Sequence, residues 1–112
     1  MFEVTYYRLS SGREPVKDFI DELPMKLKAR AIASLDLLKE EGSRLRPPDS
    51  KHMGDGLFEL RIRFSDGQVR IFYFFCKGRE IIVTNGFIKK SKKTPKGPLN
   101  IARKYKAEYE SR

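Results

Sequence analysis

Arg61, Arg63 and Arg70 are spaced so that they could bind a phosphate group together. Arg61 and Arg63 lie two residues apart in the strand-like segment 57–64, and Arg70 lies in the next strand-like segment, 69–76. Side chains two residues apart in a strand point to the same face of a sheet. A guanidinium group can donate two hydrogen bonds to one phosphate through its planar fork. The three arginines therefore predict a phosphate-binding site, provided that the two segments pair as neighbouring strands.

Two turn sequences give the expected register of these strands. Asp66-Gly67 is a strong hairpin signal that places Arg63 opposite Arg70, and Lys77-Gly78 is a weaker one that places Arg70 opposite Asn85. We expect helices to cover the apolar face of this sheet and to leave the arginine face open. The arginine face holds Glu59, Arg61, Arg63, Arg70, Phe72, Asn85 and Phe87, and the apolar face holds Phe58, Leu60, Ile62, Phe64, Val69, Ile71, Tyr73 and Phe75.

A cluster of arginines on one face needs an explanation, because like charges on paired strands are destabilising. Glu59, Asp66 or Glu80 could neutralise the cluster as an ordinary surface network. Alternatively, the repulsion is relieved when an anion binds, since local rules broken without compensation tend to mark functional sites. Glu59 could itself act as a base, or it could orient Arg61 or Arg70. The sequence leaves these interpretations open.

The distribution of charge favours an anionic partner. The chain has 24 Lys and Arg against 15 Asp and Glu, a net charge of +9, yet residues 1–60 carry 10 basic and 11 acidic side chains. The whole excess therefore lies after residue 60, which indicates a nucleic acid or an acidic protein as the partner. Phe72 and Phe87 could stack on bases or pack against a helix. The later basic residues expected to contact nucleic-acid backbone are Lys92, Lys93, Arg103 and Lys104.

Composition excludes several classes of protein. The 112 residues fit a single domain, 1–112. One cysteine, Cys76, excludes a disulfide framework, and one histidine, His52, excludes a zinc site of the usual spacing, so we expect no metal and no cofactor. No apolar run approaches the roughly 20 residues of a membrane span, and the first residues lack a signal-peptide pattern, so we expect a cytoplasmic protein that contacts no membrane.

His52 is a candidate catalytic residue because its intrinsic pKa suits proton transfer.

Hydrophobic periodicity and turn residues predict the elements that position these side chains. Pro15 and Pro24 suit the first turns of two helices, and Gly42 suits the end of the second. The order β-α-α-β-β-β-α predicts an α+β fold, with a mainly antiparallel sheet, a helical hairpin on one face and a C-terminal helix. The expected elements are a strand at 2–8, helices at 15–23 and 24–42, an irregular loop at 43–56, strands at 57–64, 69–76 and 79–88, and a helix from Thr94.

Four segments carry a resemblance to a known family: GLFELR at 56–61, VRIFYFF at 69–75, NGFIKK at 85–90 and KTP at 93–95. Together they closely resemble the RelE/ParE toxin superfamily, and they look most like its phage-derived HigB-like branch. The resemblance covers almost the whole chain, since the order of elements is also that of the family. Such proteins are the toxins of bacterial type II toxin–antitoxin pairs.

The resemblance implies an endoribonuclease that inhibits translation, because RelE- and HigB-like members cut mRNA in the ribosomal A site. The implied partners are the ribosome, mRNA and a cognate antitoxin, such as a helix-turn-helix DNA-binding protein encoded next to the toxin. ParE-like members instead poison DNA gyrase without nuclease activity. A third alternative is a catalytically inactive relic that binds RNA or antitoxin.

The resemblance also implies which residues act. In RelE-like nucleases a basic cluster on the concave face of the sheet carries the chemistry, and by position it falls on Arg61, Arg63 and Arg70. The basic residue after the last strand falls on Lys89 or Lys90, whose pKa neighbouring cations would lower, so either lysine could act as base or acid. The chain departs from the family in lacking the C-terminal histidine of some HigB-like members. The general base therefore stays open.

Overall fold

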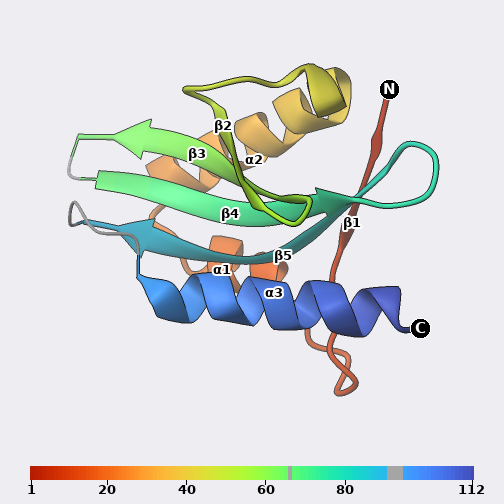
Figure 1. Ribbon diagram of the computed structural model, residues 1–112. Helices are drawn as coiled ribbons and strands as arrows, with labels where there is room; N and C mark the ends of the chain where they lie inside the picture. The colour runs from red at the N-terminus through yellow and green to blue at the C-terminus, as the bar shows by residue number, and fades with distance from the viewer. Residues whose placement is uncertain (66, 91–94) are drawn as a thin grey trace.

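The computed structural model describes residues 1–65, 67–90 and 95–112 and has five strands, three α-helices and one short 3-10 helix in them (Figure 1). The expected Asp66 turn position, the Lys92 and Lys93 contacts and the Thr94 helix cap lie outside these residues. The elements in chain order are β1 (Glu3–Tyr6), α1 (Pro15–Asp21), α2 (Met25–Glu41), η1 (Gly42–Arg44), β2 (Ser50–Gly54), β3 (Leu57–Phe64), β4 (Gly67–Phe75), β5 (Glu80–Lys89) and α3 (Lys96–Glu110).

The strands form one sheet in the order β1-β5-β4-β3-β2, in which only the β1–β5 pair of the described strands is parallel. This confirms the α+β class and the mainly antiparallel sheet. The loop expected at 43–56 is wrong in part, because β2 lies within it and pairs with β3. Its sequence, SKHMG, is short, ends in a glycine and contains a register shift between His52 and Gly54, so it carries little strand signal of its own.

One face of the sheet packs against the helical hairpin of α1 and α2, as expected. The buried side chains Leu60, Ile62 and Tyr73 of the sheet lie in one cluster with Val16 of α1 and Leu35 of α2. Each helix has its apolar residues at helical spacing, and burial of that stripe holds it on the sheet. No helix in the described part of the chain is both long and apolar enough to cross a membrane.

The opposite face, which carries the arginines, is not open as expected. Helix α3 packs across it, and Ala102 of α3 is buried with Phe72 and Phe74 of β4. Figure 1 shows α3 lying along the sheet on the side away from α2. Phe72 stacks on Phe87 at 5.7 Å between ring centroids, beneath this helix. These two aromatic residues therefore pack the final helix.

The hairpin register differs from expectation by two residues between β3 and β4. Arg61 lies opposite Arg70, and Arg63 lies opposite Gln68, because Gly67 pairs with Phe64 as the first residue of β4. A Cβ at Gly67 would lie 2.6 Å from the carbonyl oxygen of Lys89, so glycine serves close approach of the neighbouring strand. A shift of two keeps every side chain on its expected face.

The second hairpin has a longer loop than expected. Cys76 N donates to the Glu80 carbonyl at 2.8 Å, so residues 77–79 make the loop and Phe75 pairs with Ile81. This places Val83 opposite Tyr73, on the face of the sheet that packs against α1 and α2. A register shift further along the pair then brings Phe87 opposite Arg70, which restores the expected face of Phe87.

Candidate functional site

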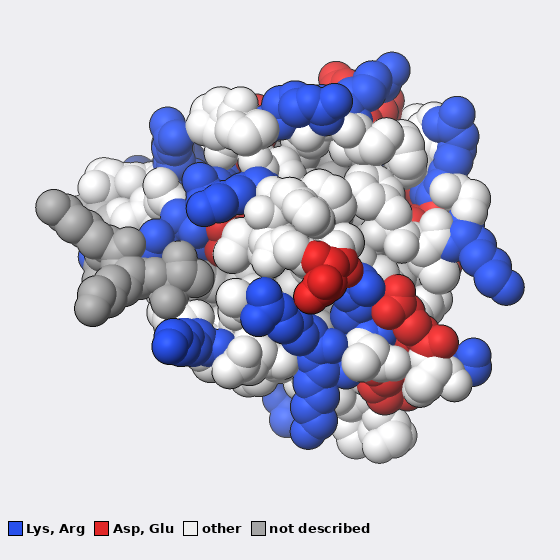
Figure 2. Space-filling model, viewed as in Figure 1, with Lys and Arg blue, Asp and Glu red and all other residues white. Residues whose placement is uncertain are grey.

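Four neighbouring strands, β2 to β5, bring polar side chains to one end of the sheet. Cross-strand pairs join Lys51 to Glu59, Arg61 to Arg70, and Gln68 to Lys89. Lys and Arg side chains gather at this end in Figure 2, where β3 and β5 end. We call six charged residues at this end the sheet-end cluster; its members are Lys51, Glu59, Arg61, Arg63, Arg70 and Lys89.

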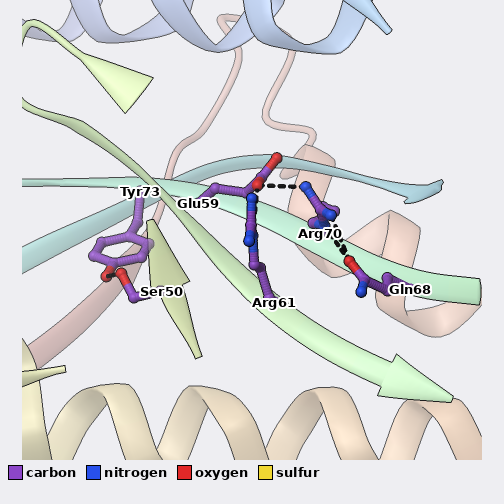
Figure 3. Close-up of polar contacts among 6 residues, drawn as sticks. All are labelled: Ser50, Glu59, Arg61, Gln68, Arg70 and Tyr73. Atoms are coloured by element: carbon purple, nitrogen blue, oxygen red, sulfur yellow. Dashed lines mark hydrogen bonds and ion pairs between the residues drawn. The ribbon is translucent and has the colours of Figure 1, made fainter. Parts of the chain in front are cut away.

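A buried carboxylate lies at the centre of the cluster. Glu59 has an exposed fraction of 0% and Arg70 of 3%. Oε1 of Glu59 accepts hydrogen bonds from Nη1 of Arg70 at 2.5 Å and from Nε of Arg61 at 3.1 Å (Figure 3). One carboxylate thus separates two guanidinium groups on adjacent strands, which offsets their repulsion. Oε2 of Glu59 is buried and has no hydrogen-bond partner among the residues described.

Gln68 completes the surroundings of Arg70. Its Oε1 accepts from Nε of Arg70 at 2.8 Å and also from Nη2 of the same guanidinium. Burial lowers the pKa of Arg70 from its ordinary value, while the charge of Glu59 opposes that shift. Held on two sides and nearly inaccessible, Arg70 is placed to position Arg61 and Glu59 rather than to contact a large ligand itself. The orienting role expected for Glu59 fits these contacts.

The accessible cations of the cluster are Arg61, Arg63, Lys51 and Lys89. The Arg61 side chain is 22% exposed, and its Nε is fixed by Glu59, which leaves the outer edge of the guanidinium for a ligand. Arg63 is exposed at the end of β3. Partial burial lowers the pKa of Lys89, and the charges of Arg70, Arg61 and Lys51 lower it further against the opposing effect of Glu59. An amine with a lowered pKa is more often neutral near physiological pH and can accept a proton.

The structure does not bring all the predicted residues together. His52 lies on the opposite face, where its ring is 4.9 Å from that of Phe58 and its Nε2 accepts from Gly56 N at 3.2 Å. Lys90 is exposed and follows the last residue of β5. Arg103 of α3 reaches β2, where it donates to the Met53 carbonyl at 3.3 Å. Lys104 instead borders a groove beside the segment 7–10.

Three residues at the site were missed by sequence reasoning. Gln68 lies two residues before Arg70, so alternation alone could have placed it on the arginine face. Lys51 could not be placed without recognising β2. Arg30 of α2 donates to the Arg63 carbonyl at 2.7 Å, a contact between residues far apart in the sequence that no local pattern predicts. Within the described ranges, no group of three or more His, Cys, Asp or Glu residues could hold a metal ion.

Comparison with known proteins identifies the family. No curated protein matches the chain. The family described as "Phage derived protein Gp49-like (DUF891)" matches residues 18–107, which begin within α1, end within α3 and include the whole sheet-end cluster. The chain therefore belongs to the Gp49-like family of phage-derived proteins, a RelE- and toxin-like family.

Proposed function

We propose that this protein is the toxin of a type II toxin–antitoxin system, of the HigB-like branch, and that it cleaves mRNA on the ribosome. The observation that carries the proposal is the sheet-end cluster, in which buried Glu59 and Arg70 hold Arg61 beside exposed Arg63 and a lysine of lowered pKa. Membership of a toxin-like family supports it.

The proposed reaction is metal-independent cleavage of a phosphodiester. The 2′-oxygen of the RNA forms a bond to the adjacent phosphorus and the bond to the 5′-oxygen breaks, which leaves a 2′,3′-cyclic phosphate and a 5′-hydroxyl. Neutral Lys89 takes the proton of the 2′-hydroxyl, and the departing 5′-oxygen takes a proton from solvent. Arg61 and Arg63 donate hydrogen bonds to the phosphoryl oxygens as negative charge develops there, commonly the largest catalytic contribution.

We infer that cleavage depends on the ribosome because Lys89 alone is an inefficient proton acceptor. Lys89 can accept a proton only in its neutral form, which is the minor form of an ordinary lysine at neutral pH and which the lowered pKa makes more abundant. A lone toxin is therefore a slow catalyst. An mRNA held in the decoding site supplies the alignment of the 2′-oxygen, phosphorus and 5′-oxygen, which can contribute several kcal/mol.

The same surface accounts for the proposed partner. Residues after 60 carry the entire positive excess of the chain. An antitoxin with an acidic segment would cover the cluster and compete with mRNA for it. We propose that this antitoxin is a small helix-turn-helix protein encoded beside the toxin, and that both act in the cytoplasm, where the ribosomes are.

Expression in bacteria tests the proposal. The wild-type protein should arrest growth and produce mRNA cut within codons, while Arg63→Ala should abolish both effects. Arg13→Ala, which removes an arginine 72% exposed and distant in sequence from the cluster, is the matched control and should remain toxic. Growth arrest with intact mRNA and a DNA-damage response would instead assign a ParE-like gyrase inhibitor. Absence of arrest and of cleavage, with RNA binding retained, would assign an inactive relic.

A further inference from the structure

A second basic feature lies beside the sheet-end cluster, at the edge of β3. A groove of about 320 Å³ opens between α2, the segment before β2 and the end of β3. Arg61 lines this groove as well as belonging to the cluster, so the two are continuous. The polar residues that line it are Arg30, Ser34, Asp49, Arg61 and Arg63.

Arg30 is held in this groove by the open edge of the sheet. Strand β2 begins at Ser50, opposite Leu60, so the last residues of β3 extend beyond it. The Arg63 carbonyl on that edge accepts from Nη1 of Arg30 at 2.7 Å. This hydrogen bond fixes the guanidinium while the other N–H donors of Arg30, which is exposed, remain for a ligand.

Asp49 gives the groove its second chemical character. Its carbonyl accepts from Arg61 N at 2.9 Å, which fixes the backbone, and its side chain is exposed in the groove. In the described part of the chain, no arginine lies within 4.0 Å of its carboxylate as an ion pair. A carboxylate accepts hydrogen bonds from N–H donors, which the arginines of the groove cannot do.

We propose that this groove binds one nucleotide of the RNA strand next to the cleaved phosphate. Arg30 and Arg63 bind its phosphodiester, and Asp49 accepts hydrogen bonds from the base. Guanine fits best, because its Watson–Crick edge offers N1–H and N2–H side by side, so the groove selects guanine at this position. That the bound nucleic acid is mRNA rests on the proposed function.

The mixture of charges distinguishes RNA from an acidic peptide as the occupant. A nucleotide carries an anionic phosphate and, on its base, hydrogen-bond donors, and the groove offers a partner for each, because both arginines and a carboxylate line it. Consecutive Asp or Glu side chains of a peptide would bind the arginines but would offer Asp49 no N–H donor.

Binding of labelled RNA away from the ribosome tests this inference. The probes are fluorescein-labelled hexanucleotides AAGAAA and AAUAAA, titrated with protein and followed by fluorescence anisotropy. Arg30→Ala should weaken binding about tenfold, as expected for loss of hydrogen bonds to a charged group. The slope of log affinity against log salt should fall by about 0.7, the value for one phosphate of a single strand. The control Arg13→Ala should change binding less than twofold.

Asp49→Asn tests the base contact. The wild type should bind AAGAAA more tightly than AAUAAA, and the variant should bind the two probes equally, since an amide offers only one acceptor oxygen. Arg30→Lys keeps the charge but lacks the fork, and it should bind with intermediate affinity. Circular dichroism establishes that each variant is folded before it is titrated.

The outcomes separate this inference from the proposed function. If Arg30→Ala binds RNA as tightly as Arg13→Ala does, the groove does not bind a nucleotide, even if the wild type cleaves mRNA on ribosomes. Loss of binding in Arg30→Ala would support the groove, even if no cleavage occurs. If hexaglutamate binds the wild type but not Arg30→Ala, and Arg30→Ala binds RNA as tightly as the wild type does, the inference is wrong and the groove binds a protein partner.

Discussion

Replacing Glu59 by glutamine should destabilise the fold severely, because the carboxylate compensates two cations in a buried place. The Glu59 side chain is 0% exposed, and those of Arg70 and Arg61 are 4% and 22% exposed. Removing one partner of a buried ion pair costs about 3–5 kcal/mol. Glutamine keeps one acceptor oxygen, so we expect the lower end, about 3 kcal/mol.

Urea unfolding measures this loss. A domain of this size has a free energy of unfolding of about 5–15 kcal/mol, so the variant should fold yet have a clearly lower midpoint with the same slope. A loss of 3 kcal/mol should lower the melting temperature by about 12 °C, at about 4 °C per kcal/mol. Far-ultraviolet circular dichroism is a suitable probe because the chain has no tryptophan.

A double variant separates the charge from the packing. Glu59→Leu combined with Arg70→Met removes both charges and keeps most of the volume, and it should lie within about 1–2 kcal/mol of the wild type. If Glu59→Gln is as stable as the wild type, the carboxylate of Glu59 does not hold the arginines together.

Three further predictions concern packing and proton transfer. Tyr73→Phe should cost about 1–2 kcal/mol in urea unfolding, because it leaves buried Ser50 without the 2.6 Å hydrogen bond; adding Ser50→Ala should cost less than the two single changes together. Gly42→Ala should lower the melting temperature more than Gly12→Ala does, because both glycines have positive φ but only at Gly42 would a Cβ clash with the ring of Phe2. Single-turnover cleavage should rise with pH and level off below the ordinary lysine pKa, because deprotonated Lys89 is the reactive form and its pKa is lowered; Lys89→Arg should remove the rise.

Alternation and helical spacing were sufficient to predict most of the fold. The strand at Leu57–Phe64 and the two faces of β3 and β4 are confirmed, because a shift of two residues in register leaves the side chains on the same faces. The register itself could not be predicted, since Gly67 was interpreted as a turn residue when its role is close approach to β5. The strand β2 depends on pairing with β3 and not on its own sequence.

Part of the sheet-end cluster was predictable from the sequence, but its organisation was not. Arg61, Arg63, Arg70 and Lys89 lie at one end of the sheet as expected. The burial of Arg70 between Glu59 and Gln68 could not be predicted. We expected the face that carries Arg70 to be open to solvent, whereas α3 packs across that face. His52 was expected to border the same site, but the backbone alternation of β2 turns it to the other face.

The ends of the cleaved RNA test the central claim most directly. Purified protein is added to ribosomes that hold a defined mRNA codon in the A site, and the products are analysed for their terminal groups. The sheet-end cluster predicts a 2′,3′-cyclic phosphate and a 5′-hydroxyl, with products lost in Arg63→Ala and kept in Arg13→Ala. Intact mRNA, or products with a 5′-phosphate and a 3′-hydroxyl, would contradict it.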